Sequence, residues 1–162
     1  MELERGDLSL LDLPVAQQLL QATIPARVAY IALDGTPRVV PMQFHWSGED
    51  VVVTCWPDDP KAAAIKAHPQ VALTIDTAEP PFRVLQIRGT ATVDLVDGVP
   101  PELTAASIRN MGPEAGQAFA DQAAQLSPQI VRIAVQPTWV DVLDFEIRLP
   151  GGMVRRLGAN AM

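Results

Sequence analysis

Short apolar runs alternate along the chain with turn-forming residues, a pattern typical of strands joined by hairpins. Residues 28–33 are almost wholly apolar, as expected for a strand covered on both faces, and Asp34-Gly35 behind them is a strong hairpin signal. Gly89 is expected to mark a bulge or a sharp bend in a long strand. The remaining strands are predicted over residues 38–46, 51–56, 71–76, 83–96, 129–136 and 139–146, with a last hairpin around residues 150–152.

Helical patterns are fewer and lie between the strands. A short helix is predicted over residues 13–21, and a second one runs from Pro60 to the His68-Pro69 pair, which stops it. Residues 100–125 predict two helices in succession. They form the one helical insertion in a chain that otherwise has the pattern of strands.

Strands that follow one another through short turns are antiparallel, and closing such a sheet removes its exposed edges. We therefore predict a mainly β protein with short helices, in which six or seven antiparallel strands form a small closed barrel. An open α+β sandwich is the alternative. Pro41 has no backbone N–H to donate, so strand 38–46 is expected to be bulged, or to lie at an edge, near that residue. Residues 1–162 are predicted to form a single domain.

The composition excludes several classes of function. The formal net charge is −7, and the twelve basic residues are scattered, whereas a nucleic-acid partner would need a basic face. No apolar run approaches the roughly 20 residues that span a bilayer, and we expect no signal peptide. Cys55 is the only cysteine, which excludes an intramolecular disulfide and suits a reducing compartment. We expect a cytoplasmic protein with no membrane or nucleic-acid partner.

The motifs of several enzyme classes are absent from the sequence. It contains no G-x-S-x-G, no P-loop and no G-x-G-x-x-G, so hydrolases, nucleoside triphosphatases and Rossmann proteins are not indicated. His45 and His68 are the only histidines, and they have neither metal-ligand spacing nor a carboxylate partner in a recognisable motif. No metal site is therefore predicted, and no catalytic side chain is assigned.

The clearest candidate for ligand binding is the start of the helix that follows strand 51–56. Asp58 or Asp59 is expected to cap this helix, with Pro60 at its first position and Lys61 directly behind. A lysine side chain and the free backbone N–H groups of a helix start would then meet at one spot. A phosphate group requires such an arrangement.

The order and spacing of these features resemble those of the pyridoxamine 5'-phosphate oxidase-like family, whose members are FMN-binding split β-barrels. The resemblance covers roughly residues 13–148 and implies an antiparallel split β-barrel of six to seven strands. The features that match the family are the initial helix, Asp34-Gly35, Pro37-Arg38-Val39-Val40-Pro41-Met42, strand 51–56, Lys61, His68-Pro69-Gln70-Val71-Ala72-Leu73, Gln86-Ile87-Arg88-Gly89 and the closing strand 139–145.

Members of this family resemble one another in forming homodimers that hold FMN, or a related deazaflavin coenzyme, at the subunit interface. For this chain, the resemblance implies that one strand lines the isoalloxazine ring through Arg38, Val39, Val40, Pro41, Met42 and Gln43. Thr54 and Cys55 would lie near the ribityl chain or the phosphate, and Lys61 would contact the phosphate. Arg88, on a neighbouring strand, is a further candidate.

One feature departs from the family pattern. Relatives usually carry an arginine next to this lysine or two positions before it, where this chain has Pro60 and Asp59. A carboxylate beside a phosphate site is repulsive, by on the order of 1 kcal/mol for a solvated pair about 4 Å apart. Either Asp59 caps the helix and turns away, or FMN binding is weakened, a different ligand is favoured, or the site is lost.

Two functions are therefore predicted. The first is an FMN- or deazaflavin-dependent oxidoreductase that acts as a homodimer on a small molecule, because the cofactor carries the hydride and no catalytic side chain is required. The alternative is a non-catalytic split-barrel dimer that binds a small ligand, such as a flavin or haem, as a carrier or sensor. Asp59 favours this alternative. A purely structural dimer would leave the arrangement at Lys61 without an explanation.

Overall fold

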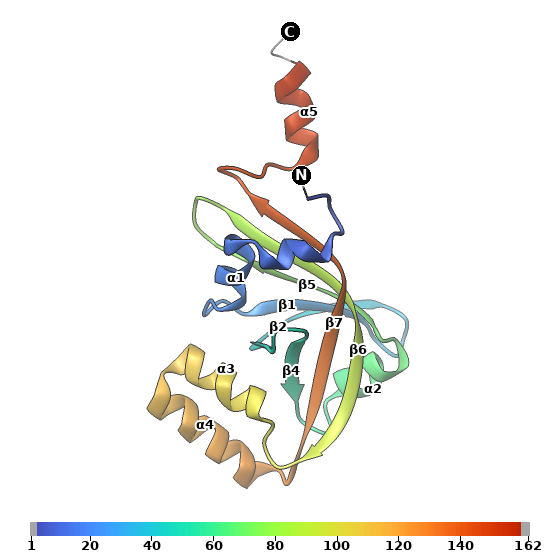
Figure 1. Ribbon diagram of the computed structural model, residues 1–162. Coiled ribbons are helices and arrows are strands. Elements are labelled where there is room, and N and C mark those ends of the chain that lie inside the picture. Colours follow the sequence, from blue (N-terminus) through green and yellow to red (C-terminus); the bar gives the residue numbers. More distant parts are fainter. Residues whose placement is uncertain (1–2, 160–162) are drawn as a thin grey trace.

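Two long antiparallel strands, β6 (Arg83–Asp97) and β7 (Gln129–Asp144), run through the whole body of the protein (Figure 1). The computed structural model describes residues 3–159. Seven antiparallel strands follow the order β2-β1-β5-β6-β7-β4-β3. The other strands are β1 (Ala26–Ile31), β2 (Pro37–Met42), β3 (His45–Trp46), β4 (Val51–Cys55) and β5 (Gln70–Asp76).

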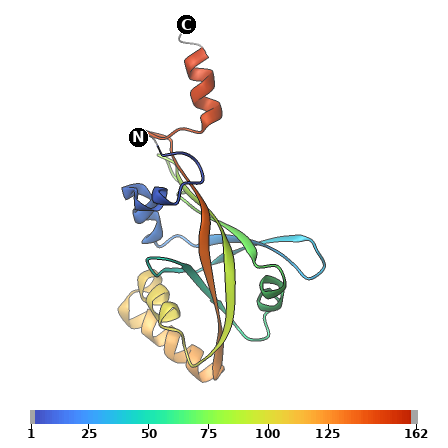
Figure 2. The ribbon, with the colours of Figure 1, turned by 45° about the vertical axis from the view of Figure 1, so that its right-hand side comes forward.

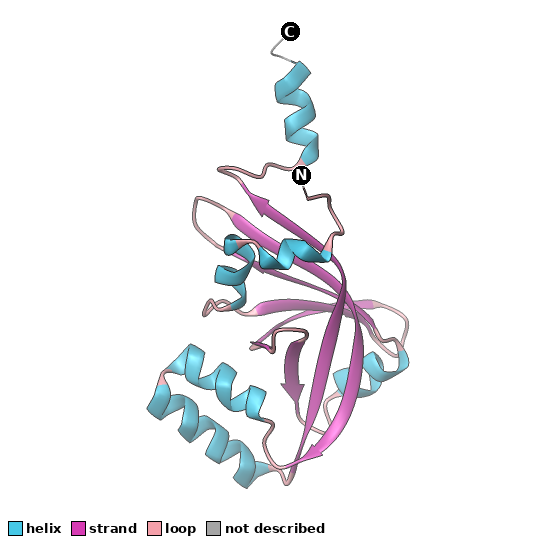
Figure 3. Cartoon of the chain, in the orientation of Figure 1, coloured by secondary structure: helices cyan, strands magenta, loops and turns pink. Residues whose placement is uncertain are grey.

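The helices lie around the outside of this strongly twisted sheet (Figure 3). The 3₁₀ helix η1 and helix α1 pack on β5, β6 and β7, and α2 packs on β1 and β6. Helices α3 and α4 form a hairpin beside β4, on the flank away from α2 (Figure 2). Their bounds are η1 Leu8–Asp12, α1 Pro14–Leu20, α2 Pro60–Ala67, α3 Pro101–Met111, α4 Pro113–Leu126 and α5 Gly151–Ala159. No helix among residues 3–159 has the length and apolar character needed to cross a membrane.

The predicted antiparallel split barrel of six to seven strands is confirmed, but the sheet does not close. The predicted strand over residues 38–46 is divided at Gln43-Phe44 into β2 and β3, which lie at opposite ends of the sheet. Phe44 is completely buried, so the chain turns inward at this point instead of continuing the ladder. β2 is thus an edge strand, as the proline at position 41 indicates, and this edge leaves the barrel split.

The bulge expected at Gly89 is confirmed, and it explains one error in the predicted strands. Residues 129–136 and 139–146 belong to a single strand, β7, although Pro137 lies between them. Arg88 pairs with Trp139 while Gly89 pairs with Pro137, so β7 carries one extra residue at this point. A bulge tolerates the missing N–H of a proline. A Cβ atom at Gly89 would lie only 2.3 Å from the carbonyl oxygen of Gln136, which explains the glycine.

The hairpin predicted around residues 150–152 is wrong, because a helix begins there. α5 extends away from the rest of the protein (Figure 1) and contains no buried residue. Met153, Val154 and Leu157 follow the spacing of a helix face and remain exposed.

The main core fills the space enclosed by the curved sheet, and α3 and α4 contribute no side chain to it. These two helices pack closely on each other through Gly116 of α4. A Cβ atom at this position would lie 2.4 Å from the backbone N and Cα atoms of Ile108 in α3. The glycine therefore sets the distance between the two helices of the hairpin.

We expect Gly116→Ala to lower the free energy of unfolding by about 1–3 kcal/mol, because the added methyl group must push the α3 backbone away. The matched control is Gly158→Ala in α5, where a Cβ atom meets nothing within 4 Å and where alanine favours the helix. Chemical denaturation of both variants provides the measurement. Equal stabilities for the two variants would contradict the close packing of α3 on α4.

Candidate functional site

A pocket of about 350 Å³ opens between β2, β4, the start of α2 and the α3–α4 hairpin. This volume lies in the range of small-molecule sites, roughly 300–1,000 Å³. The pocket is lined by Val40, Pro41, Met42, Gln43, Val52, Thr54, Cys55, Trp56, Asp59, Lys61, Glu102, Leu103, Ala106, Phe119, Ala123 and Ile130. Its walls are mostly apolar, and its only formally charged lining residues are Asp59, Lys61 and Glu102.

The pocket brings together most of the residues that the sequence proposed for cofactor binding. They come from three separate elements: β2 with the residue after it, the end of β4, and the first turn of α2. The residues concerned are Val40, Pro41, Met42, Gln43, Thr54, Cys55 and Lys61. Residues as far apart in the chain as Val40 and Lys61 therefore form one surface.

Three of the proposed residues do not line this pocket. Arg38 lies near the start of β2 and faces the β1–β2 turn, where its Nη2 atom is 3.0 Å from Oδ2 of Asp34. Val39 and Arg88 line a second, more open cavity of about 230 Å³. Because side chains alternate along a strand, Val39 faces away from its neighbour Val40. The Arg88 guanidinium stacks over the Trp139 ring, 4.0 Å from its centroid.

β4 forms the floor of the pocket. One face of this strand packs in the main core, and the other face lines the pocket. Val51 and Val53 belong to the main core, and the alternating residues Val52 and Thr54 line the pocket. All three valines are buried, so the continuous apolar run in the sequence reflects a strand between two layers. The second layer is the α3–α4 hairpin.

Asp59 and Lys61 form an ion pair at the start of α2. Oδ1 of Asp59 accepts a hydrogen bond from the backbone N of Lys61 at 2.9 Å, and Oδ2 lies 2.5 Å from Nζ of Lys61. Burial would raise the pKa of Asp59, but the hydrogen bonds from Lys61 outweigh it and hold the pKa below its ordinary value. The expected cap is present, but the Asp59 side chain stays at the pocket instead of turning away.

Glu102, in the first turn of α3, is a pocket residue that the sequence did not indicate. Its Oε1 atom accepts hydrogen bonds from Nε and Nη2 of Arg132, at 2.9 and 2.7 Å. Burial opposes ionisation, but the Arg132 hydrogen bond prevails and lowers the pKa of Glu102. An acidic residue in the first turn of a helix is so common that nothing in the sequence distinguishes this one. The apolar pocket residues of α3 and α4 were missed as well, because apolar residues recur at helical spacing in any amphipathic helix.

Arg109 of α3 holds the corner of the chain that carries Gln43 into the pocket. Its Nη2 atom donates a hydrogen bond to the carbonyl oxygen of Phe44. The guanidinium also lies 4.6 Å from the centroid of the Phe44 ring. The helical hairpin is thus tied directly to the break between β2 and β3.

Cys55 lines the pocket but is not a nucleophile at neutral pH. Burial, with a smaller contribution from the Asp59 carboxylate, raises the pKa of its thiol to about 11. The thiolate is the reactive form of cysteine, so the thiol is inert near pH 7. Among residues 3–159, no group of three or more His, Cys, Asp or Glu side chains could hold a metal ion.

Comparisons with known proteins agree with this fold. The sequence model of the pyridoxamine 5'-phosphate oxidase family matches residues 14–144. An F420 reductase structure is 30% identical, with a TM-score of 0.57, over 77% of this chain and 94% of the reductase. No curated protein sequence matches the chain significantly.

Two further solved structures share the fold at lower sequence identity. A conserved hypothetical protein from Mycobacterium tuberculosis is 16% identical, with a TM-score of 0.68, over 93% of this chain and 94% of that protein. The heme storage protein HutZ from Vibrio cholerae is 17% identical, with a TM-score of 0.60, over 80% of this chain and 92% of HutZ. At these identities the likeness shows the fold alone.

The raised pKa of Cys55 predicts a shifted pH profile of alkylation by iodoacetamide. In the folded protein the rate should rise with a midpoint near pH 11, because only the thiolate reacts. The same protein unfolded in guanidinium chloride is the control, with an expected midpoint near the ordinary value of 9.0. Asp59→Asn should lower the folded midpoint by removing a neighbouring negative charge. A low plateau with an unshifted midpoint would mean that restricted access, and not the pKa, protects the thiol.

Proposed function

Because the chain belongs to the pyridoxamine 5'-phosphate oxidase family, we propose that it is a flavin-dependent oxidoreductase that binds FMN, or a deazaflavin coenzyme, in the pocket above β4. It acts as a single-domain protein, assembled as a homodimer in the cytoplasm, on a small-molecule substrate. The observation that carries the proposal is the convergence of seven of the ten expected cofactor residues on one pocket of suitable size.

The chemistry of the pocket fits a flavin in most respects. A flat aromatic ring system suits apolar walls, which are supplied by residues such as Val52, Leu103 and Ile130. β2 is an edge strand, so one side of its backbone has free N–H and C=O groups for the polar rim of the ring. Lys61 is the single cation available to a phosphate among the lining residues.

A bound flavin would supply hydride transfer, and the protein would supply binding, orientation and the exclusion of water. β2 would set the plane of the ring, and the α3–α4 hairpin would cover it on the other side. The protonated Cys55 thiol would act as a neutral wall and take no part in proton transfer. No side chain of the pocket needs to act as an acid or base.

The phosphate end of the site is the point at which the fit is weakest. The Lys61 ammonium and backbone N–H both already have the Asp59 carboxylate as a partner. Side chains of Lys61 and Asp59 are only 17% and 22% exposed, so the pair is poorly screened by water. A phosphate group must therefore compete with Asp59 for Lys61, and we expect weaker FMN binding than a site with a free cation would give.

A homodimer would complete the site with the residues that a single chain leaves outside it. Val39 and Arg88 lie together at the second cavity, with Trp139, and every residue that lines this cavity belongs to a strand. A second copy that presents this surface to the pocket would place these residues near the cofactor. The proposed interface therefore joins the pocket of one protomer to the second cavity of its partner.

The alternative function is ligand binding without redox turnover, as a carrier or sensor. The Asp59–Lys61 pair favours it, because this pair weakens the phosphate contact on which FMN binding depends. A relative of this fold, HutZ, is named as a heme storage protein. Flavin binding without oxidation of NAD(P)H or of a reduced deazaflavin would decide for this alternative.

The proposal predicts that the purified protein, or the protein after addition of FMN or a deazaflavin, absorbs light as a protein-bound flavin does. Titration calorimetry should give one cofactor per protomer and should fit a single site. Bound flavin can be removed by dialysis against denaturant. Adding the flavin back to the refolded protein and measuring its binding then tests whether binding is specific. No binding of either cofactor would exclude the flavin-dependent function.

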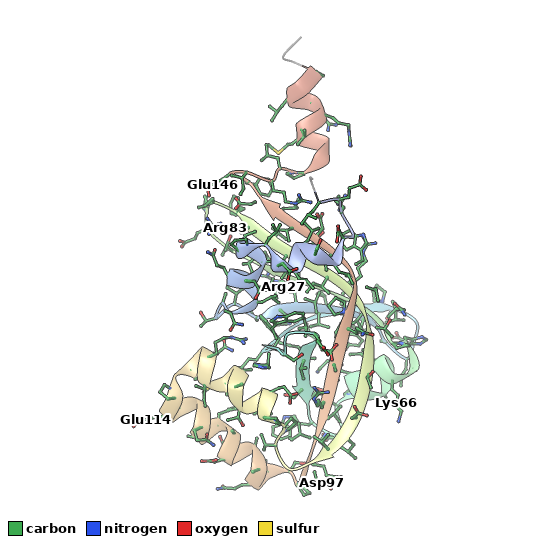
Figure 4. All side chains as sticks on the ribbon, in the orientation of Figure 1. Arg27, Lys66, Arg83, Asp97, Glu114 and Glu146 are labelled. Atoms are coloured by element: carbon green, nitrogen blue, oxygen red, sulfur yellow. The ribbon has the colours of Figure 1, made fainter. Side chains whose placement is uncertain are left out.

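The role of Lys61 is tested by comparing two flavins that differ only in the phosphate. Lys61→Ala should weaken FMN binding by about 1–3 kcal/mol, the usual range for a charge-assisted hydrogen bond. It should leave riboflavin, which has no phosphate, almost unaffected. The matched control is Lys66→Ala, in the last turn of the same helix, where the side chain lies at the surface (Figure 4). An equal loss for both flavins would place the phosphate elsewhere.

A further inference from the structure

Helix α5 carries an apolar face that stays exposed in the described chain. Met153, Val154 and Leu157 lie on one side of the helix, and each is between 43% and 55% exposed. Three of the nine residues of α5 are glycines, which disfavour a helix. An isolated helix shorter than about 12–15 residues is only marginally stable in water. A surface that covers the apolar face would therefore stabilise α5 as a helix.

The charges of α5 indicate the kind of surface that fits it. Arg155 and Arg156 border the apolar face, and the helix contains no acidic residue. Neither arginine forms an ion pair within residues 3–159. The complementary surface is thus apolar and carries carboxylates that have no cation as a partner.

Helix α4 presents such a surface. Phe119 and Leu126 share one side of this helix and are 38% and 68% exposed. Glu114 and Asp121 form a second exposed stripe, and α4 contains no basic residue. Neither carboxylate is in an ion pair within the part of the chain that the structure describes. Glu114 lies at the outer end of the helical hairpin (Figure 4).

Helices α4 and α5 lie at opposite ends of the protein in both ribbon views (Figure 1, Figure 2), so α5 does not reach α4 of its own chain. We propose that α5 docks on α4 of a second copy of this chain. Its apolar face then covers Phe119 and Leu126, and its two arginines meet the unpaired carboxylates. Two copies related by a two-fold axis make this contact twice. The contact rests on the homodimer of the proposed function, but it is independent of the cofactor.

An anionic membrane is the other surface that suits a short basic amphipathic helix. The net charge of −7 opposes this alternative, because the body of the protein is repelled by anionic lipids. A second copy offers an apolar stripe and unpaired carboxylates together, without that repulsion at α5.

The docked helix also bears on the pocket, because Phe119 is one of the lining residues. An α5 helix that packs on Phe119 lies at the rim of the pocket. Each copy thus extends the wall of the other copy's pocket.

The apolar part of the contact is tested with Leu157→Asp in the full chain. This variant places a carboxylate in the apolar contact, next to the acidic stripe of α4, and should raise the dimer Kd by about tenfold or more. Sedimentation velocity over a range of protein concentrations measures the Kd. The matched control, Ala159→Asp, adds the same charge on the opposite side of α5 and should associate as the wild type does. Because α5 contributes no residue to the core, both variants should fold.

The charged part of the contact is tested by reciprocal reversal. Arg155→Glu combined with Arg156→Glu should weaken the dimer, and so should Glu114→Arg combined with Asp121→Arg. A chain that carries all four substitutions has the net charge of the wild type and opposite charges across the contact again. Its Kd should therefore return toward the wild-type value.

The outcomes separate this contact from the rest of the proposed function. If the wild type is a dimer and Leu157→Asp dimerises equally well, the contact is overturned while the homodimer stands. A monomeric wild type overturns both, whereas the flavin titrations decide on cofactor binding by themselves. Failure of the four substitutions to restore association would overturn α4 as the docking surface. Binding of the full chain to phosphatidylserine vesicles, lost in Leu157→Asp with no change in the dimer Kd, would assign α5 to a membrane instead.

Discussion

The burial of Phe44 is the constraint on which the site depends. This ring enters the core at the point where a regular strand would have continued. The two residues Gln43 and Phe44 therefore separate β2 from β3. Because β2 and β3 then lie at opposite ends of the sheet, the barrel stays split. The split leaves β2 as an edge strand beside an opening, and the pocket lies at that opening. One buried aromatic side chain thus links the packing of the core to the existence of the site.

The α3–α4 hairpin converts this opening into an enclosed pocket. It stands outside the main core, and Arg109 ties it to Phe44 while Glu102 ties it to β7. Both contacts involve part-buried charged groups, which are favourable only when the geometry is good. The two helices approach each other closely at Gly116, and α3 packs on β4. The hairpin therefore lines the pocket although its sequence is that of an ordinary amphipathic helix pair.

The electrostatics of the pocket differ from those of a simple anion site. Each charged group that lines it already has a partner of opposite charge: Asp59 with Lys61, and Glu102 with Arg132. Such a pocket attracts a ligand through shape and hydrogen bonds more than through net charge, in a protein whose overall charge of −7 repels anions. The balance is consistent with a mostly neutral ring system that carries one anionic group.

The sequence by itself determined the local elements: the Asp34-Gly35 hairpin, a bulge or bend at Gly89, a helix cap at Asp58 or Asp59 and the antiparallel character of the sheet. These depend on turn chemistry, alternation and capping, which act over a few residues. Tertiary structure alone decided that strand 38–46 breaks at Phe44, that residues 129–144 form one strand through Pro137, and that residues 151–159 are helical. It also decided which candidates meet, because the positions of Arg38 and Arg88 depend on which face of the sheet each side chain occupies and on what packs there. Contacts between residues far apart in the chain leave no periodic trace in the sequence, so Glu102 and Arg132 become a pair only in the folded protein.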